Sequence, residues 1–319
     1  MNNKNLPSDQ FGRKFTKLRL NLLDACSMRC IYCMPSDQKF HKLKELLTPI
    51  EMKEIVKNLI NEGIEEVRLT GGEPLLHPQF PEIIKELSTL DLKKLSLTTN
   101  AIELDKFLPL LQECNIKSLN ISLDSLEEKS FEFITRTNTF KQVFANTLKA
   151  KELGFKIKIN TVLLKNINYE EVEQFLSFSA THDIEVRFLE LMKIGEALSY
   201  YERHFVSAQE VIDNISKSWS LEKVSMPHDS TSFNYIATKD NLIAKVGFIA
   251  SESKPFCSGC SRLRLSNKGV LRPCIMINEG PDIRHLPRSE YTKTLQELIQ
   301  KKPINRLYGT HVKMNEIGG

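Results

Sequence analysis

The 319-residue sequence lacks several features that would restrict its function. No stretch approaches the ~20 consecutive apolar residues of a membrane-spanning helix. Its first residues, 1–7, have no apolar run after their charge, so they do not resemble a secretory signal. The net charge is only +4, so composition gives no general reason to expect nucleic-acid or membrane binding. We therefore expect a cytoplasmic protein with no nucleic acid and no membrane among its partners.

Internal repeats, low-complexity tracts and linkers rich in Gly or Ser are also absent from the sequence. With 41% hydrophobic residues, a chain of this length buries a sizeable core, as one large domain or as a domain with an appendage. The 7 cysteines are an odd number. Because thiols stay reduced inside cells, clustered cysteines indicate a metal site more than disulfides.

Short runs rich in β-branched residues alternate with amphipathic segments up to Met192. Strands are predicted at 18–23, 67–70, 94–99, 119–123, 157–164 and 185–191, and helices at 49–61, 80–88, 140–153 and 169–182. This alternation predicts an α/β fold with a parallel sheet, whose functional site lies at the carboxyl ends of the strands.

The pattern changes after Met192. A helix is expected at 207–219, strands at 231–238, 242–249, 262–266 and 270–272, and a late helix at 289–301. We therefore divide the chain into a first unit, residues 1–220, and a C-terminal module, residues 221–319.

Three cysteines, Cys26, Cys30 and Cys33, follow the first predicted strand with the spacing C-x3-C-x2-C. Three thiolates can hold three irons of a cubane cluster and leave the fourth iron open for a small molecule. The alternative is a structural zinc site completed by Cys114 or a histidine. Zinc sites usually pair two C-x2-C units, so the spacing favours a cluster.

This motif, with the aromatic Tyr32 before its last cysteine, resembles the signature of the radical SAM superfamily. The resemblance implies that the open iron binds S-adenosylmethionine (SAM) and that SAM is cleaved to a 5′-deoxyadenosyl radical. Polar or glycine residues at the ends of later strands are the SAM-binding candidates that the resemblance implies. Together with Tyr32 they are Gly71, Gly72, Glu73, Thr98, Asn100, Ser122, Arg187 and Met192.

A second cysteine group, Cys257, Cys260 and Cys274, again supplies three thiolates. A zinc site with His285 as fourth ligand is the alternative for this group. Arg262 and Arg264 lie between the ligands, two apart on a predicted strand, so both side chains point to the same face. Paired guanidiniums beside a metal site suit a phosphate-bearing substrate, whereas an isolated pair would more often be an exposed basic face.

The second group narrows the resemblance to the family of molybdenum cofactor biosynthesis protein A, the GTP 3′,8-cyclases. The segments that carry it are 12–13, 18–20, 30–35, 68–76, 122–125, 187–192, 262–265 and the closing Ile317-Gly318-Gly319. The resemblance implies a partial (β/α)6 radical SAM barrel, a C-terminal module with a second cluster, and thus two [4Fe–4S] clusters facing one cavity. It implies a lyase that abstracts the ribose 3′ hydrogen of GTP and forms 3′,8-cyclo-GTP.

The same resemblance implies the remaining binding residues and partners. Arg19, Arg68, Lys158, Arg262 and Arg264 would contact GTP, and the tail residues Gly318 and Gly319 would enter the cavity. A reductant protein such as flavodoxin or ferredoxin would supply electrons, and a downstream enzyme would convert the product to a pyranopterin. The resemblance also allows a homodimer.

Three positions depart from the family pattern. Glu66 stands where relatives commonly carry a basic residue, Ala101 replaces a glycine, and Ala25 replaces an arginine. Because a carboxylate repels a triphosphate, Glu66 bears on nucleotide binding. Two other functions stay open at this point: a radical SAM enzyme acting on another substrate such as a peptide, and a non-catalytic zinc-binding module.

Overall fold

The computed structural model describes residues 8–318 of the chain. Parallel strands form its centre, each hydrogen-bonded to the next in chain order. They are β1 (Lys17–Asn21), β2 (Glu66–Thr70), β3 (Lys94–Thr99), β4 (Ser118–Ser122), β5 (Lys156–Val162) and β6 (Glu185–Leu189). Val67 of β2, for example, is in register with Leu18 of β1 and with Leu95 of β3. The predicted α/β fold with a parallel sheet is confirmed.

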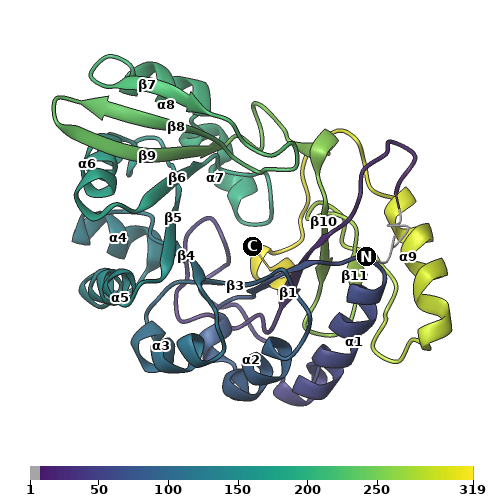
Figure 1. Cartoon of the computed structure of the whole chain (residues 1–319). Helices are drawn as coiled ribbons and strands as arrows, with labels where there is room; N and C mark the ends of the chain where they lie inside the picture. Colours follow the sequence, from purple (N-terminus) through teal and green to yellow (C-terminus); the bar gives the residue numbers. More distant parts are fainter. Residues whose placement is uncertain (1–7, 319) are drawn as a thin grey trace.

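Helices follow these strands and cover the outer face of the sheet (Figure 1). They are α1 (Pro49–Asn61), α2 (Phe80–Ser88), α3 (Leu104–Glu113), α4 (Glu128–Thr135), α5 (Phe140–Glu152) and α6 (Val172–His182). Helix α1 begins at a capping box, in which the Thr48 hydroxyl accepts from the Glu51 N–H and the Glu51 carboxylate accepts from the Thr48 N–H. Among residues 8–318, no helix combines the length and apolar character needed to cross a bilayer.

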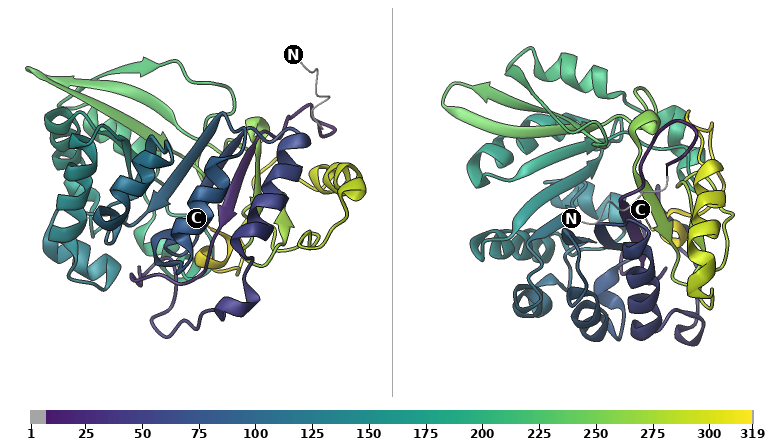
Figure 2. Two further views of the ribbon diagram at one scale, coloured as in Figure 1. Left: turned by 60° about the horizontal axis from the view of Figure 1, so that its bottom comes forward. Right: turned by 45° about the vertical axis from the view of Figure 1, so that its right-hand side comes forward.

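The rest of the chain adds strands to both ends of the same sheet (Figures 1 and 2). It contains α7 (Ala197–His204), α8 (Ala208–Ile215), β7 (Ser220–Val224), β8 (Phe233–Lys239), β9 (Leu242–Ile249), β10 (Arg262–Leu265), β11 (Leu271–Arg272), α9 (Tyr291–Gln300) and α10 (Met314–Ile317). β10 lies parallel to β1 and β9 lies parallel to β6, so the strand order is β11-β10-β1-β2-β3-β4-β5-β6-β9-β8-β7. The two ends do not pair, and the barrel is therefore partial.

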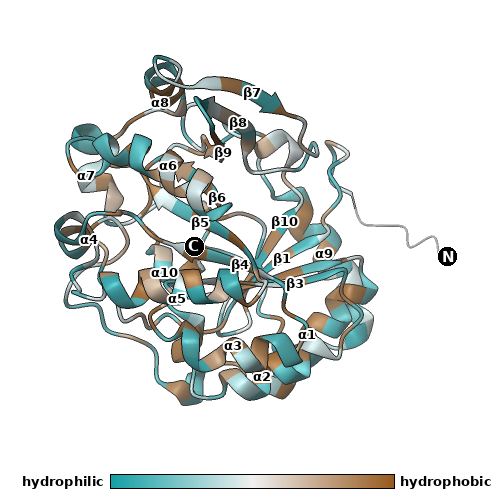
Figure 3. Cartoon of the chain, turned by 60° about the vertical axis from the view of Figure 1, so that its left-hand side comes forward, coloured by the Kyte–Doolittle hydropathy of each residue, from teal (hydrophilic) through white to brown (hydrophobic). Residues whose placement is uncertain are grey.

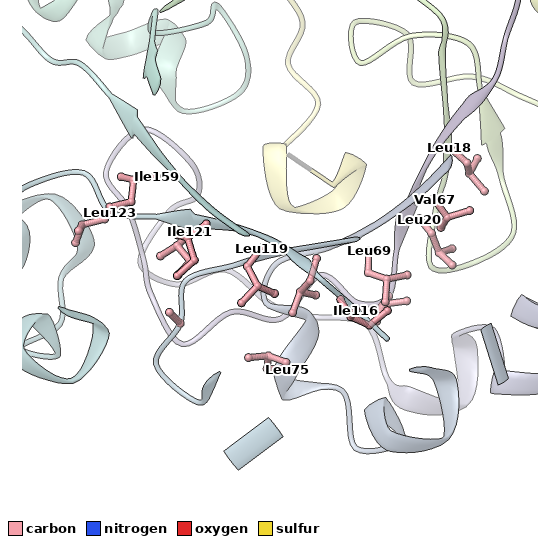
Figure 4. Packing of buried hydrophobic residues seen from close by; sticks show 14 of the residues in the cluster. Leu18, Leu20, Val67, Leu69, Leu75, Ile116, Leu119, Ile121, Leu123 and Ile159 are labelled. Atoms are coloured by element: carbon pink, nitrogen blue, oxygen red, sulfur yellow. The ribbon is translucent and has the colours of Figure 1, made fainter. Parts of the chain in front are cut away.

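Alternation along the strands separates an apolar outer face from a polar inner face. Leu18, Leu20, Val67 and Leu69 are almost fully buried and point to the helix side, as Figure 4 shows. The residues between them point inward, and Arg19 on β1 is one of these. Hydrophilic and hydrophobic residues alternate along the outer helices, as the teal and brown segments of Figure 3 show. The barrel interior is thereby left to charged and polar groups, which positions the site described next.

Candidate active site

A cavity of about 310 Å³ lies inside the barrel, beneath loops of the C-terminal part. Both cysteine groups line it: Cys26, Cys30 and Cys33 from the loop after β1, and Cys257, Cys260 and Cys274 from the segments around β10 and β11. All six are free thiols in the structure. Cys114, the remaining cysteine, ends α3 and packs against the hydrophobic core instead.

The first cysteine loop is fixed by backbone contacts to two other elements. The N–H of Ile31 donates to the Ile134 carbonyl at 3.0 Å, which ties the loop to the end of α4. On its other side, the N–H of Gly72 donates to the Leu23 carbonyl at 2.7 Å. A Cβ atom on Gly72 would lie 2.2 Å from the Ala25 carbonyl oxygen. Only glycine therefore lets the end of β2 approach the cysteine loop so closely.

Burial controls the chemistry of these thiols. It is the largest cause that raises the pKa of Cys26 to about 11 and that of Cys33 to about 12, and it also raises the pKa of Cys30. Because metal ligands are thiolates, loading this site releases protons. Within the described part of the chain, no three Cys, His, Asp or Glu side chains converge on a single point as a compact metal cage.

The second cysteine group lies in a more basic setting. Burial alone would raise the pKa of Cys260, but the charges of Arg262 and Lys302 outweigh burial and lower it to about 6. The Lys302 ammonium also donates to the Arg262 carbonyl at 2.8 Å and to the Pro273 carbonyl. Lys302 is only 3% exposed. It therefore ties together the segments that carry Cys260 and Cys274.

Most of the residues predicted to bind SAM line the cavity near the first cysteine group. They are Tyr32, Gly71, Gly72, Thr98, Asn100, Ser122, Arg187 and Met192. The Tyr32 hydroxyl donates to the Asp124 carboxylate at 2.6 Å, and burial raises the pKa of Asp124 to about 6. Asp124 also lines the cavity. It lies two residues after Ser122, the last residue of β4, in a segment that carries the family resemblance.

Glu73 is the exception among these residues, because it lies behind the cavity wall. Its carboxylate accepts from the Thr99 hydroxyl at 2.7 Å, the Asn100 N–H at 2.6 Å and the Leu75 N–H at 3.1 Å. Burial raises its pKa to about 7. In this arrangement Glu73 positions Thr99 and Asn100, and a direct contact from Glu73 to SAM stays a prediction.

Four of the five residues predicted to bind GTP also line the cavity: Arg19, Arg68, Arg262 and Arg264. Burial is the largest cause that lowers the pKa of Arg68 and of Arg264, each to about 10. Both guanidiniums still carry a charge near neutral pH. Several buried positive charges in one cavity create a strong preference for an anionic ligand.

Lys158, the fifth predicted GTP contact, is not part of this cavity wall. It lines a neighbouring cavity, where its ammonium lies 2.9 Å from a Glu185 carboxylate oxygen. Glu185 also pairs with Arg187 at 2.5 Å. Two of the basic residues on β5 and β6 are therefore already partly neutralised by one carboxylate.

The tail reaches the cavity from the far end of the chain. Met314 and Asn315 line it, and Arg264 donates to the carbonyls of Ile317 and Gly318. Ile317 is 2% exposed and packs with Ile194 and Met276. A Cβ on Gly318, whose φ is +70°, would come 2.5 Å from the Thr70 hydroxyl oxygen. Gly319 lies outside the described residues.

Two sequence families match separate parts of the chain. The Radical SAM superfamily matches residues 20–179 and the family called Molybdenum Cofactor Synthesis C matches residues 184–311. The chain is 44% identical over 311 residues to a Synechocystis protein named GTP 3′,8-cyclase, covering 98% of this chain and 94% of that protein. It is 37% identical to the protein of the same name from Aquifex aeolicus, covering 87% of each. The chain belongs to the GTP 3′,8-cyclase family of the radical SAM superfamily.

Solved structures share this fold. Streptococcus suis SuiB bound to S-adenosylmethionine has a TM-score of 0.66 at 15% identity, covering 90% of this chain and 68% of SuiB. SuiB bound to its precursor peptide SuiA has a TM-score of 0.65 at the same identity, covering 91% of this chain and 66% of SuiB. At this level of identity the likeness concerns the fold alone.

The donor set of this GTP 3′,8-cyclase family member fits iron–sulfur clusters. Each of its two cysteine groups offers three thiols to the same cavity, and thiolates are the ligands that such clusters take. Gly71 and Gly72, which have no side chains, line the same cavity as the first cysteine group. Family membership supports an iron–sulfur cluster and SAM in this protein.

Proposed function

We propose that this chain converts GTP to 3′,8-cyclo-GTP for molybdenum cofactor biosynthesis, as a lyase. One observation carries the proposal: both cysteine groups and the buried arginines line a single cavity. A relative that is 44% identical over nearly its whole length is named GTP 3′,8-cyclase. Fold, donor set and charge thus support the same reaction.

In this proposal each cysteine group holds a [4Fe–4S] cluster, at Cys26, Cys30 and Cys33 and at Cys257, Cys260 and Cys274. The first cluster, held by Cys26, Cys30 and Cys33, would with bound SAM supply a 5′-deoxyadenosyl radical that removes the ribose 3′ hydrogen of GTP. The ribose carbon would then bond to guanine C8, and uptake of one electron from the reductant and one proton would complete the product. The protein contributes binding, orientation and exclusion of water.

The chain's own residues divide this work by position. Tyr32, held by Asp124, and Asn100, whose amide lies 3.1 Å from the Ser27 hydroxyl, shape the SAM end of the cavity. Arg19 and Arg262 face the cavity from neighbouring strands and would hold the phosphates of GTP. The tail would close the cavity over both ligands.

We also propose the partners that this reaction needs. A protein such as flavodoxin or ferredoxin would deliver electrons, and a second enzyme would convert the cyclised nucleotide to a pyranopterin. The protein would work in the cytoplasm, with no nucleic acid and no membrane as partners, as a monomer or homodimer.

The other two functions considered from the sequence are not favoured. A radical SAM enzyme acting on a peptide is suggested by the likeness to SuiB bound to its precursor peptide, but at 15% identity that likeness concerns the fold alone. A zinc-binding module without catalysis is not favoured either, because curated relatives at up to 44% identity are named as enzymes.

The deciding experiment is an anaerobic assay of the reconstituted protein with GTP, SAM and dithionite, followed by mass analysis of the nucleotides. The Cys274→Ala variant should still form 5′-deoxyadenosine but make little cyclised nucleotide, because the substrate's anchor is lost. Cys114→Ala, which changes a cysteine outside the cavity, should behave as the wild type. A wild-type protein with full iron content and no cyclised GTP would disprove the proposal.

A further inference from the structure

A second cavity, of about 400 Å³, lies at the amino-terminal ends of the barrel strands. The first residues of five strands line it: Lys17, Glu66, Lys94, Ser118 and Lys156. Arg19, Arg68, Arg187 and Arg262 line both this cavity and the first one. The two cavities therefore meet at these four guanidiniums. A long ligand bound in the first cavity could therefore extend past these arginines into the second, which is also lined by polar residues.

The second cavity is strongly basic, because eight Lys or Arg residues but only two Asp or Glu residues line it. Several of its cations already have carboxylate partners. Lys17 lies 2.6 Å from Asp229, and Lys158 lies 2.9 Å from Glu185. Lys94 differs from them. It is half-buried, yet within residues 8–318 its ammonium has no ion pair and no hydrogen bond.

The side chain of Lys94 points into the barrel. Residues 94, 96 and 98 alternate along β3, so Lys94, Ser96 and Thr98 share one face. Thr98 lines the first cavity, while Ser96 and Lys94 line the second. One face of β3 thus runs from the SAM end of the first cavity to the cation at the far end of the second.

Lys94 is the register partner of Glu66 on the neighbouring strand. Their side chains lie on the same face, although the two do not form an ion pair among the described contacts. Burial, followed by the charge of Arg68, lowers the pKa of Lys94, and the charge of Glu66 partly opposes this. The Arg68 Nε atom is itself buried without a hydrogen-bond partner in the described structure. Unneutralised cations in a half-buried cavity are unfavourable unless an anion joins them.

We propose that Lys94 binds the terminal phosphates of the nucleotide substrate, and that it offsets the carboxylate of Glu66 on the neighbouring strand. This inference rests on the proposed function, because GTP would supply the phosphate chain that extends past the guanidiniums shared by the two cavities. The base and ribose then occupy the cavity of the cysteine groups. The terminal phosphates of GTP then lie at the amino-terminal ends of the barrel strands, near Lys94 and Arg68.

The test measures binding of GTP and of guanosine to the reconstituted protein under anaerobic conditions. The Lys94→Gln variant should bind GTP roughly ten- to a hundredfold more weakly, the range for losing one charged hydrogen bond. Its affinity for guanosine, which has no phosphates, should not change. Adding Glu66→Lys to this variant should restore much of the GTP affinity, because that position faces the same cavity.

Lys93→Gln provides the matched control. Lys93 precedes Lys94, is exposed and pairs with Glu65 at 2.8 Å, so its loss should leave GTP affinity unchanged. Equal GTP affinity in the Lys94→Gln variant and the wild type would overturn the inference. An equal loss for GTP and guanosine would overturn it as well, because it would show a general structural defect.

Inorganic tripolyphosphate separates this inference from the proposed function. If the wild type binds no GTP, yet binds tripolyphosphate in a manner that Lys94→Gln weakens, the phosphate site stands and the proposed function falls. If the wild type binds GTP and Lys94→Gln changes neither ligand, the proposed function stands and the role of Lys94 falls.

Discussion

At the scale of single residues, Glu73 does not line the cavity itself but positions a residue that does. A carboxylate directly after two glycines suggested a direct contact with the SAM ammonium. In the structure both of its oxygens are taken up by donors from the ends of β2 and β3. Its position fixes Asn100, which does line the cavity.

Glu73→Gln should lower the free energy of unfolding by roughly 1–3 kcal/mol, because an amide nitrogen cannot accept the hydrogen bonds that the second oxygen accepts. The pH dependence should change as well. The pKa of Glu73 rises from 4.5 to about 7 on folding, so folding takes up a proton between these values. The wild type should therefore gain stability from this group as the pH falls from about 7 towards 5.5. Anaerobic urea unfolding at several pH values would detect that gain, and equal pH slopes in both proteins would contradict the assignment.

Lys302 acts in the same indirect way at the second cysteine group. Its ammonium donates to the backbone carbonyls of Arg262 and Pro273, which lie close in sequence to two cysteines of the group. Arg13 in turn donates to the Lys302 carbonyl at 2.7 Å and to the Cys257 carbonyl at 2.8 Å. Lys302→Met should leave the carbonyls of Arg262 and Pro273 buried and unpaired. We expect iron to fall from about eight towards about four per chain, with the electron paramagnetic resonance signal of the first cluster retained.

Lys301→Met is the control for that experiment, because Lys301 is the exposed neighbour of the buried Lys302. It should keep the full iron content. Full iron in the Lys302→Met protein would show that the cysteine segments hold their positions without the ammonium.

At the scale of elements, the close packing of β2 on the first cysteine loop depends on Gly72. Gly72→Ala should push the two apart, since its Cβ would lie 2.2 Å from the Ala25 carbonyl oxygen. We expect loss of iron from the first site and loss of 5′-deoxyadenosine formation. Gly154→Ala is the comparison, because Gly154 has a φ of +85° but no neighbour within 4 Å. That change should cost about 1–2 kcal/mol of stability and leave SAM cleavage intact. Normal cleavage by Gly72→Ala would refute the packing argument.

The elements themselves were largely predictable from the sequence. Hydrophobic periodicity predicted all six barrel strands, and the helix predicted at 49–61 has those bounds in the structure. α3 was not among the predicted helices, and it contains Pro109, a residue that disfavours a helix interior. The helix expected at 207–219 is shorter, and α8 spans Ala208–Ile215. Ala101, named above as a departure from the family pattern, has a φ of +62°, a conformation that glycine adopts more readily than alanine.

The site was predictable where a motif, a strand end or the family resemblance marked its residues. The spacing of Cys26, Cys30 and Cys33 carries its own signal, because three thiolates on one short loop must face the same ligand. Lys94 and Lys302 carry no such signal. A single lysine is usually an exposed surface residue, and only the fold brings these two to a cavity wall. Their importance depends on partners that are distant in sequence, such as Arg262 for Lys302.

At the scale of the whole molecule, the two parts of the chain share one sheet. The division at residue 220 stays a prediction, but strands from beyond it pair with both ends of the six-stranded centre: β10 with β1 and β9 with β6. The second cysteine group is thereby held at a fixed place across the cavity from the first. Two sites on distant segments can then act on one substrate with a constant separation.

The tail completes this arrangement, because it connects strands from both ends of the sequence. The Asn21 amide of β1 donates to the carbonyls of Asn315 and Glu316 at 3.2 and 3.0 Å, while Arg264 of β10 holds the carbonyls of Ile317 and Gly318. Ile317 anchors the segment in an apolar cluster. Ile317 therefore anchors the tail, while Gly318, which has no side chain, passes close to the Thr70 hydroxyl without a collision.

Deleting Gly318 and Gly319 should consequently preserve folding, both clusters and SAM binding, because Ile317 and the Asn21 contacts remain. It should nevertheless remove most cyclised product, since Arg264 loses a carbonyl partner and the cavity loses its closure. Unfolding curves, iron content and SAM titration test the first expectation, and mass analysis of nucleotides tests the second. A peptide ending in Ile-Gly-Gly, added in trans, should restore part of the product. A truncated protein that cyclises GTP at the full-length rate would show that Arg264 serves GTP without help from the tail.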